Sequence, residues 1–203
     1  MTTIERYLIS VAAVLLMQWG YVTAEEAVDP HAHHHQMQQE VQRSTVAYEL
    51  PKVKVVREDG KPVAFTAEID DGRPVILNFI YTTCTGICPI SSQVFAQFQN
   101  KLGNDRDKVH MVSISIDPEQ DTPARLRNYA KQYQAGAQWN HYTGTTEASL
   151  AIQRAFDVYR GNKMNHNPVT LLRVAPGQPW LRLDGFATAD DLLSSYRDLV
   201  TAK

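Results

Sequence analysis

An apolar segment followed directly by the chain's two cysteines constrains the fold of this sequence more than any other feature. The run Pro74-Val-Ile-Leu-Asn-Phe-Ile80 is almost continuously apolar, as in a central strand that is covered on both faces. Cys84 and Cys88 follow this run and stand just before the helical spacing of apolar residues from Pro89 to Leu102. We therefore expect a strand, a cysteine-containing turn and a helix in immediate succession.

The remaining segments alternate between strand-like and helix-like patterns. Val53 to Val56 and Pro62 to Thr66 flank an Asp-Gly turn and predict an N-terminal β-hairpin. Val109 to Ile116 predicts a second buried strand, and Thr122-Pro123 predicts the start of a helix. The other expected elements are a strand at 139–142, a helix at 146–156, a hairpin of 169–174 with 180–183, and a helix from 188 to about 200. This order predicts an α/β fold in which a mixed sheet is flanked by helices.

The first 24 residues are expected to act as a signal peptide. Arg6 precedes an uncharged apolar run from Tyr7 to Met17, and Val22-Thr23-Ala24 supplies the small residues of a cleavage site. An uncleaved anchor is the alternative, although the apolar stretch is shorter than the roughly 20 residues that span a bilayer. In both cases we expect an exported, periplasmic protein that is either soluble or tethered to the membrane by this segment.

Residues 25–45 are polar, lack hydrophobic periodicity and are expected to form a disordered tether. This segment contains His31, His33, His34, His35 and Met37. It is either a solvated linker or an accessory metal-collecting site, because His-rich tracts bind metals by composition. Residues 46–203 are then expected to form one globular domain, which agrees with a total length of 203 residues.

The charge of the chain excludes one class of partner. Its 20 Lys and Arg residues are set against 22 Asp and Glu residues, which gives a net charge of −2. Such a chain has no basic excess to attract nucleic acid, and it contains no glycine-rich phosphate loop. We therefore expect neither a nucleic-acid partner nor a nucleotide site.

The spacing of Cys84 and Cys88 points to chemistry at the start of a helix. Side chains four residues apart on a helical turn share one face, with their Cβ atoms roughly 5–6 Å apart. The two sulfurs can therefore share a metal ion, or oxidise to a disulfide after a modest backbone adjustment. The helix N-terminus also lowers the pKa of a thiol and favours the thiolate, which is both the ligand and the nucleophile. These properties indicate a functional pair rather than an inert structural disulfide.

Two thiolates alone leave a metal site incomplete, and three histidines outside the tether are candidates for a further ligand. His110 lies within a buried-strand pattern and His141 flanks a short strand, so both are expected to be hydrogen-bonded core residues. His166 lies in a polar loop just before the strand expected at 169–174. If that strand is adjacent to 75–80, this loop lies over the cysteine turn. His166 is then either a ligand or an exposed loop histidine.

Three motifs in this order resemble the Sco/SenC family of copper chaperones. They are Tyr81-Thr82-Thr83-Cys84 leading to Cys88-Pro89, then Ser115-Ile116-Asp117-Pro118-Glu119-Gln120-Asp121-Thr122-Pro123, and a lone downstream His166. The resemblance covers about residues 50–200. It implies a thioredoxin-like fold, and the buried-strand runs predict that its central sheet includes 75–80, 109–116 and 169–174. It also implies one copper ion, as Cu(I) or Cu(II), bound by Cys84, Cys88 and His166.

The sequence departs from the family's pattern in two places. Residues 85–87 read Thr-Gly-Ile, where the family commonly has Pro and an acidic residue between the cysteines. Asn165 and Asn167 flank the histidine, where Asp and Ser are usual. These differences remove negative charge near the expected ligands. Asp117 is expected either to supply a carboxylate near the site or to cap a turn.

The resemblance leads to two functional hypotheses. The first is an exported chaperone that delivers copper to a cuproprotein, with cytochrome c oxidase, through its subunit II, as the acceptor and other copper chaperones as further partners. The alternative is a thiol–disulfide reductase, which would use Cys84 and Cys88 to keep a partner's copper-ligand cysteines reduced. Both hypotheses use the same two cysteines, but only the first strictly needs His166.

Overall fold

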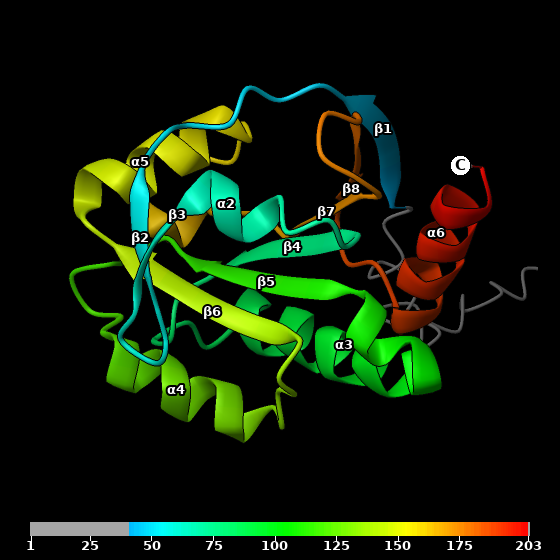
Figure 1. The fold of residues 1–203 in the computed structure, drawn as a ribbon. Helices are drawn as coiled ribbons and strands as arrows, with labels where there is room; N and C mark the ends of the chain where they lie inside the picture. Colours follow the sequence, from blue (N-terminus) through cyan, green and yellow to red (C-terminus); the bar gives the residue numbers. More distant parts are fainter. Residues whose placement is uncertain (1–40, 203) are drawn as a thin grey trace, which may run out of the picture. The chain divides into compact units, whose positions relative to one another are not determined.

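The computed structural model describes residues 41–202, which form an eight-stranded mixed sheet with helices on both faces (Figure 1). The strands are β1 (Gln42–Val46), β2 (Lys54–Arg57), β3 (Pro62–Ala64), β4 (Val75–Ile80), β5 (His110–Ser115), β6 (Trp139–Gly144), β7 (Val169–Arg173) and β8 (Trp180–Asp184). The α-helices are α2 (Phe65–Ile69), α3 (Ile87–Leu102), α4 (Pro123–Gln132), α5 (Thr146–Ala155) and α6 (Ala189–Thr201). Two 3-10 helices, η2 (Gly103–Lys108) and η3 (Lys163–Asn165), lie in the connections.

The sheet has the strand order β1-β8-β7-β4-β5-β6-β2-β3. β4 lies at its centre, parallel to β5 and antiparallel to β7, so the three segments predicted to share one sheet do so. Because β4 and β7 run in opposite directions, the end of β4 lies beside the start of β7, where Asn78 pairs with Thr170. The loop that precedes β7 is thereby placed next to the turn that follows β4.

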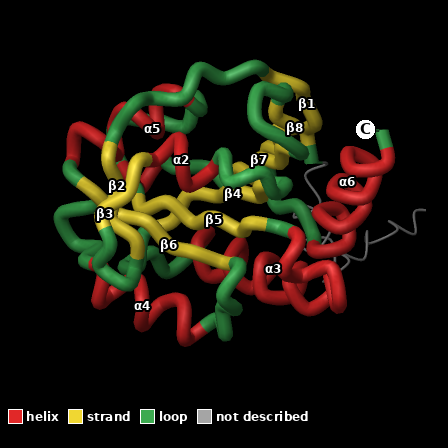
Figure 2. The backbone as a smooth tube through the Cα atoms, in the orientation of Figure 1, coloured by secondary structure: helices red, strands yellow, loops and turns green. Residues whose placement is uncertain are grey.

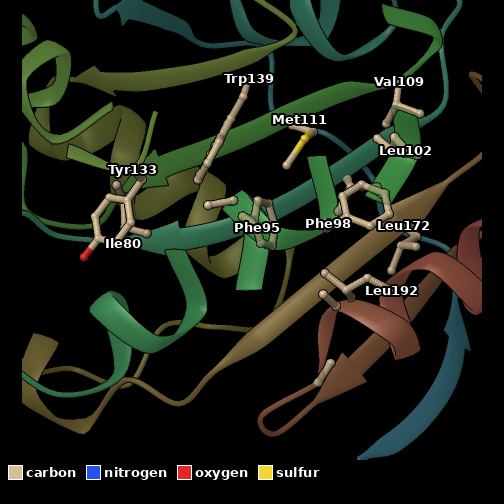
Figure 3. Close-up of a cluster of buried hydrophobic side chains, with 14 of the residues drawn as sticks. Ile80, Phe95, Phe98, Leu102, Val109, Met111, Tyr133, Trp139, Leu172 and Leu192 are labelled. Carbon is tan, nitrogen blue, oxygen red and sulfur yellow. The ribbon is translucent and has the colours of Figure 1, made fainter. Parts of the chain in front are cut away.

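Two apolar clusters cover the two faces of the sheet. On β4, Ile76 and Ile80 belong to one cluster and Val75, Leu77 and Phe79 to the other, as the two-residue period of a strand requires. Helices α3, α4 and α6 lie on the first face, and α2 and α5 lie on the second (Figures 1 and 2). Figure 3 shows the first cluster, whose largest members include Phe95, Phe98 and Trp139. This packing explains why β4 is buried along its whole length.

The turn and capping residues identified in the sequence lie where the structure has the corresponding turn and helix start. The β2–β3 hairpin turns at Gly60, whose φ of 89° lies in the left-handed region that favours glycine. Thr122 caps α4 by accepting the N–H of Arg125, and Pro123 is the first residue of that helix. These contacts confirm the predicted N-terminal hairpin and the predicted start of α4.

Three features differ from the sequence predictions. Residues 42–45, expected to belong to the disordered tether, lie in β1, because the edge of β8 offers this polar segment a row of backbone partners. Thr66, expected in a strand, lies in the short helix α2, which was not predicted and which buries Phe65 and Ile69. The 3-10 helices were also not predicted. The expected signal peptide and residues 25–40 of the expected tether lie outside the described residues.

Candidate metal centre

Cys84 and Cys88 lie in the turn after β4 and in the first turn of α3, respectively. Both are free thiols; Cys88 is fully buried and Cys84 is partly exposed. The Cys84 Sγ accepts the backbone N–H of Cys88 at 3.3 Å. This contact satisfies one of the unpaired amides at the helix N-terminus, whose capping residue, Gly86, has no side chain to do so.

His166 comes from a distant part of the chain and contacts the buried cysteine. It follows the 3-10 helix Lys163–Asn165 and precedes β7, so the pairing of β7 with β4 carries it to the cysteine turn. Its Nε2 atom lies 3.5 Å from the Cys88 Sγ, although the two residues are 78 positions apart. The side chain is buried, with 8% of its surface exposed. Of the two readings left open by the sequence, the exposed loop histidine is therefore wrong.

The two thiols have opposite tendencies to ionise. Burial alone raises the pKa of the Cys84 thiol, but hydrogen bonds, first among them the one from the Cys88 amide, outweigh it and lower the pKa overall. Burial raises the pKa of the Cys88 thiol. Burial also lowers the pKa of the His166 imidazole, which favours the neutral form that a metal ligand requires.

Tyr81, which directly follows β4, contacts several parts of the centre. Its ring packs edge-on against the imidazole of His166, with 6.0 Å between the ring centroids. Its hydroxyl donates to the Met164 Sδ at 3.5 Å, and the Lys163 ammonium lies 5.5 Å from the ring centroid. Burial and the neighbouring Cys84 raise the pKa of Tyr81 to about 12, so the phenol stays protonated and can donate. Tyr81 therefore couples the cysteine turn to the His166 loop.

Asp121 fixes the backbone of the cysteine turn and was missed as a site residue in the sequence. Its fully buried carboxylate accepts the N–H of Thr82 at 3.1 Å and the Thr82 hydroxyl at 2.5 Å. It also accepts the hydroxyl of Ser115, at the end of β5, at 2.6 Å. In the sequence, Asp121 was indicated only by its position in the segment 115–123, which carries part of the family resemblance.

Asp117 contacts the His166 loop through a lysine. Its carboxylate lies 2.5 Å from the Lys163 ammonium, and its own N–H donates to Ser115. Within the described part of the chain, its carboxylate makes no hydrogen bond to either sulfur or to the imidazole. Asp117 is therefore linked to the His166 loop through Lys163.

A cavity of about 260 Å³ opens onto the centre. Its lining includes Cys84, Met164 and His166. Across residues 41–202, no group of three or more His, Cys, Asp or Glu side chains is already arranged around one point as for a metal ion. The Cys84 sulfur faces the amide of Cys88.

The other candidate histidines do not join this centre. His141 is fully buried and stacks on Trp139, with 5.2 Å between the ring centroids. His110 begins β5 beside Val75, at the opposite end of the strands from the cysteine turn, and its Nε2 lies 3.1 Å from the Asn140 Oδ1. Both are buried, as expected, but the expectation of a hydrogen-bonded ring is met only by His110: neither ring nitrogen of His141 has a hydrogen-bond partner among the described residues. The tether residues His31, His33, His34, His35 and Met37 lie outside the described residues.

The fold and the centre together define a class of protein: a thioredoxin-like domain with a dithiol at a helix start and a histidine against the buried sulfur. The sequence profile of the SCO1/SenC family matches residues 41–200. The chain therefore belongs to the SCO1/SenC family. A SCO1 protein homolog from Bacillus subtilis (strain 168) is 31% identical over 104 residues, which cover 51% of this chain and 53% of that relative. The chain thus spans about half the length of this curated relative.

Solved structures support the same fold. A SCO1/SenC family lipoprotein from Bacillus anthracis str. Ames superposes with a TM-score of 0.67 at 21% identity, covering 77% of this chain and 98% of the other. BsSco, a member of the Sco family of cytochrome c oxidase assembly proteins in which a disulfide switch was identified, gives 0.64 at 24% identity, with coverage of 79% and 98%. Arabidopsis thaliana ScoI with copper bound gives 0.62 at 24% identity, again covering 79% and 98%. The predicted thioredoxin-like fold is confirmed.

Proposed function

We propose that this protein is an exported copper chaperone that binds one copper ion through Cys84, Cys88 and His166 and passes it to a cuproprotein. The observation that carries the proposal is the 3.5 Å contact between the Cys88 Sγ and the His166 Nε2. Two sulfurs and one imidazole nitrogen suit copper, because soft thiolates select copper(I) and a nitrogen donor also suits copper(II). Zinc suits this set less well, because structural zinc sites normally close with four ligands.

The acceptor and the compartment form part of the same proposal. Relatives of the same fold include a lipoprotein and a member of a family of cytochrome c oxidase assembly proteins. We therefore take cytochrome c oxidase, through its subunit II, as the acceptor. The periplasm is the proposed location, reached through residues 1–24 as a cleaved signal or a membrane anchor. No helix within residues 41–202 is both long and apolar enough to span a membrane.

A copper titration of single variants tests the ligand set. The full chain is used with His31, His33, His34 and His35 replaced by alanine, so that these residues do not mask the loss of a ligand. We expect Cys84→Ser and Cys88→Ser to abolish tight copper(I) binding, because each removes a soft donor. His166→Ala should keep copper(I) on two sulfurs but largely lose copper(II). Asn167→Ala, an exposed neighbour of His166, is the matched control and should bind both ions normally.

A second function, thiol–disulfide reduction, is favoured by one specific observation. The partly exposed Cys84 has a lowered pKa and the buried Cys88 a raised one, as suits an attacking thiol followed by a resolving thiol. The His166→Ala variant separates the two functions. If this variant binds copper(I) and copper(II) as before while Cys84 and Cys88 still exchange disulfides with a partner, the reductase function is favoured over the chaperone function.

A further inference from the structure

We propose that Met164 supplies a thioether ligand to copper(I) at the mouth of the centre, as a fourth donor beside Cys84, Cys88 and His166. The proposal rests on the proposed function, because it requires copper(I) to enter this site. It adds a ligand that neither the cysteine motif nor the histidine position indicates, and it assigns a route by which the ion reaches the buried donors.

The exposure of Met164 is the first observation. Its side chain is 70% exposed, the largest value among the large hydrophobic residues in the described part of the chain. Methionine normally stabilises a fold by filling gaps in the core, as Met111 does in β5 with none of its surface exposed. An exposed methionine gains little from burial, so packing does not account for this residue.

The second observation is that Met164 is held in a defined position despite its exposure. Its backbone N–H donates to the Asn162 Oδ1 at 2.9 Å, which fixes the start of the 3-10 turn. Its Sδ accepts the Tyr81 hydroxyl at 3.5 Å, and the same Tyr81 ring packs against His166. The thioether is therefore positioned by Tyr81, and Met164, His166 and Cys84 line the same cavity of about 260 Å³.

The chemistry of a thioether suits this position. Thioether sulfur is a soft donor that favours copper(I), and it carries no proton that must leave before a metal binds. Cys88 and His166 are buried, whereas Met164 and Cys84 are the two donors that a partner can reach. Copper(I) would bind first to this outer pair and then move inward by ligand exchange. No electron is transferred, and each thiol releases its proton to solvent as its copper–sulfur bond forms.

Selenium labelling gives a direct test. The full chain, with His31, His33, His34 and His35 replaced by alanine and Met37 by leucine, is prepared with selenomethionine and loaded with one equivalent of copper(I). X-ray absorption at the selenium edge is expected to show a copper–selenium bond. Met164→Leu, which keeps a similar apolar volume, should lose this signal, and its copper(I) affinity should fall by roughly tenfold. Tyr81→Phe keeps the ring but removes the hydroxyl, and should weaken and broaden the copper–selenium shell.

Three outcomes count against the proposal in different ways. If copper(I) binds in a Cys84-dependent manner but no copper–selenium bond is present, Met164 is not a ligand and only this inference fails. If copper(I) binds without any dependence on Cys84 and Cys88, the proposed function fails and this inference fails with it. A copper–selenium signal that persists in Met164→Leu would assign the bond to another methionine and would also overturn the inference.

Discussion

Asp121 accepts hydrogen bonds from both the backbone N–H and the hydroxyl of Thr82, 39 positions earlier in the chain. The same carboxylate accepts the hydroxyl of Ser115, so one buried side chain joins the end of β5 to the turn that carries Cys84. Three donors converge on a group that is fully shielded from solvent. These hydrogen bonds anchor the cysteine turn to the end of β5.

The first prediction concerns this carboxylate. Asp121→Asn places an amide N–H against hydroxyl and amide donors, and should lower the free energy of unfolding by about 1.5–3 kcal/mol, the range for buried hydrogen bonds to a charged group. Urea unfolding measures the change. Asp107→Asn is the control, because its side chain is 89% exposed and its loss should change little. Equal stability of the two variants would show that the network around Asp121 contributes nothing.

The second prediction concerns the reactivity of the two thiols. Cys84 is partly exposed with a lowered pKa, whereas Cys88 is buried with a raised pKa, so more of Cys84 is thiolate at any pH near neutrality. Iodoacetamide should therefore modify Cys84 in the Cys88→Ser variant on the order of tenfold or more faster than Cys88 in the Cys84→Ser variant. The pH midpoint of the Cys84 reaction should lie below the ordinary thiol value. Similar rates for both cysteines in the folded protein would contradict this asymmetry.

The third prediction concerns copper binding at acidic pH. Copper affinity should fall as the pH falls, because protons compete for every ligand. Burial lowers the pKa of His166 below its usual 6.5, so the imidazole should still be available at pH 6.5 and should be lost only at lower pH. The difference in copper(II) affinity between the native protein and His166→Ala should therefore persist at pH 6.5 and shrink below it. Titrations at several pH values provide the measurement, and a difference that vanishes above pH 6.5 would refute the prediction.

The fourth prediction concerns a histidine with no role in the centre. Burial lowers the pKa of His141 to about 3, so the folded protein does not take up the proton that the unfolded chain accepts near pH 6.5. His141 therefore contributes to a loss of stability as the pH falls from about 6.5 toward 3. His141→Phe keeps a ring against Trp139 and should reduce that loss. Unfolding of the two proteins at matched pH values measures the effect; parallel stability curves would rule it out.

The central part of the fold could be predicted because its signals are local. Continuous apolar runs indicated β4 and β5, and Thr122-Pro123 indicated the start of α4. The contact of His166 with Cys88 could also be predicted, because it requires only that β7 lie beside β4. A resemblance in motif then favoured His166 over the other histidines.

Other features depend on contacts that no local pattern contains. β1 is the polar segment QRSTV, and it forms a strand only because β8, some 140 residues later, pairs with it. The helix α2 has five residues and lacks a side-chain cap, so it has no clear signal of its own. Asp121 and Met164 are ordinary residues in the sequence, and their positions follow from Thr82 and Tyr81 in another part of the chain.

The pairing of β1 with β8 determines where this domain can be shortened. Val46 pairs with Trp180 and Gln42 pairs with Asp184, so β1 covers the whole length of β8. A chain cut at residue 46 would leave β8 as an open edge with unpaired backbone groups, beside side chains that include the buried Trp180 and Leu183. Such an edge can join to the same edge of another molecule, so aggregation in a truncated protein would reflect the missing strand rather than the chemistry of its cysteines.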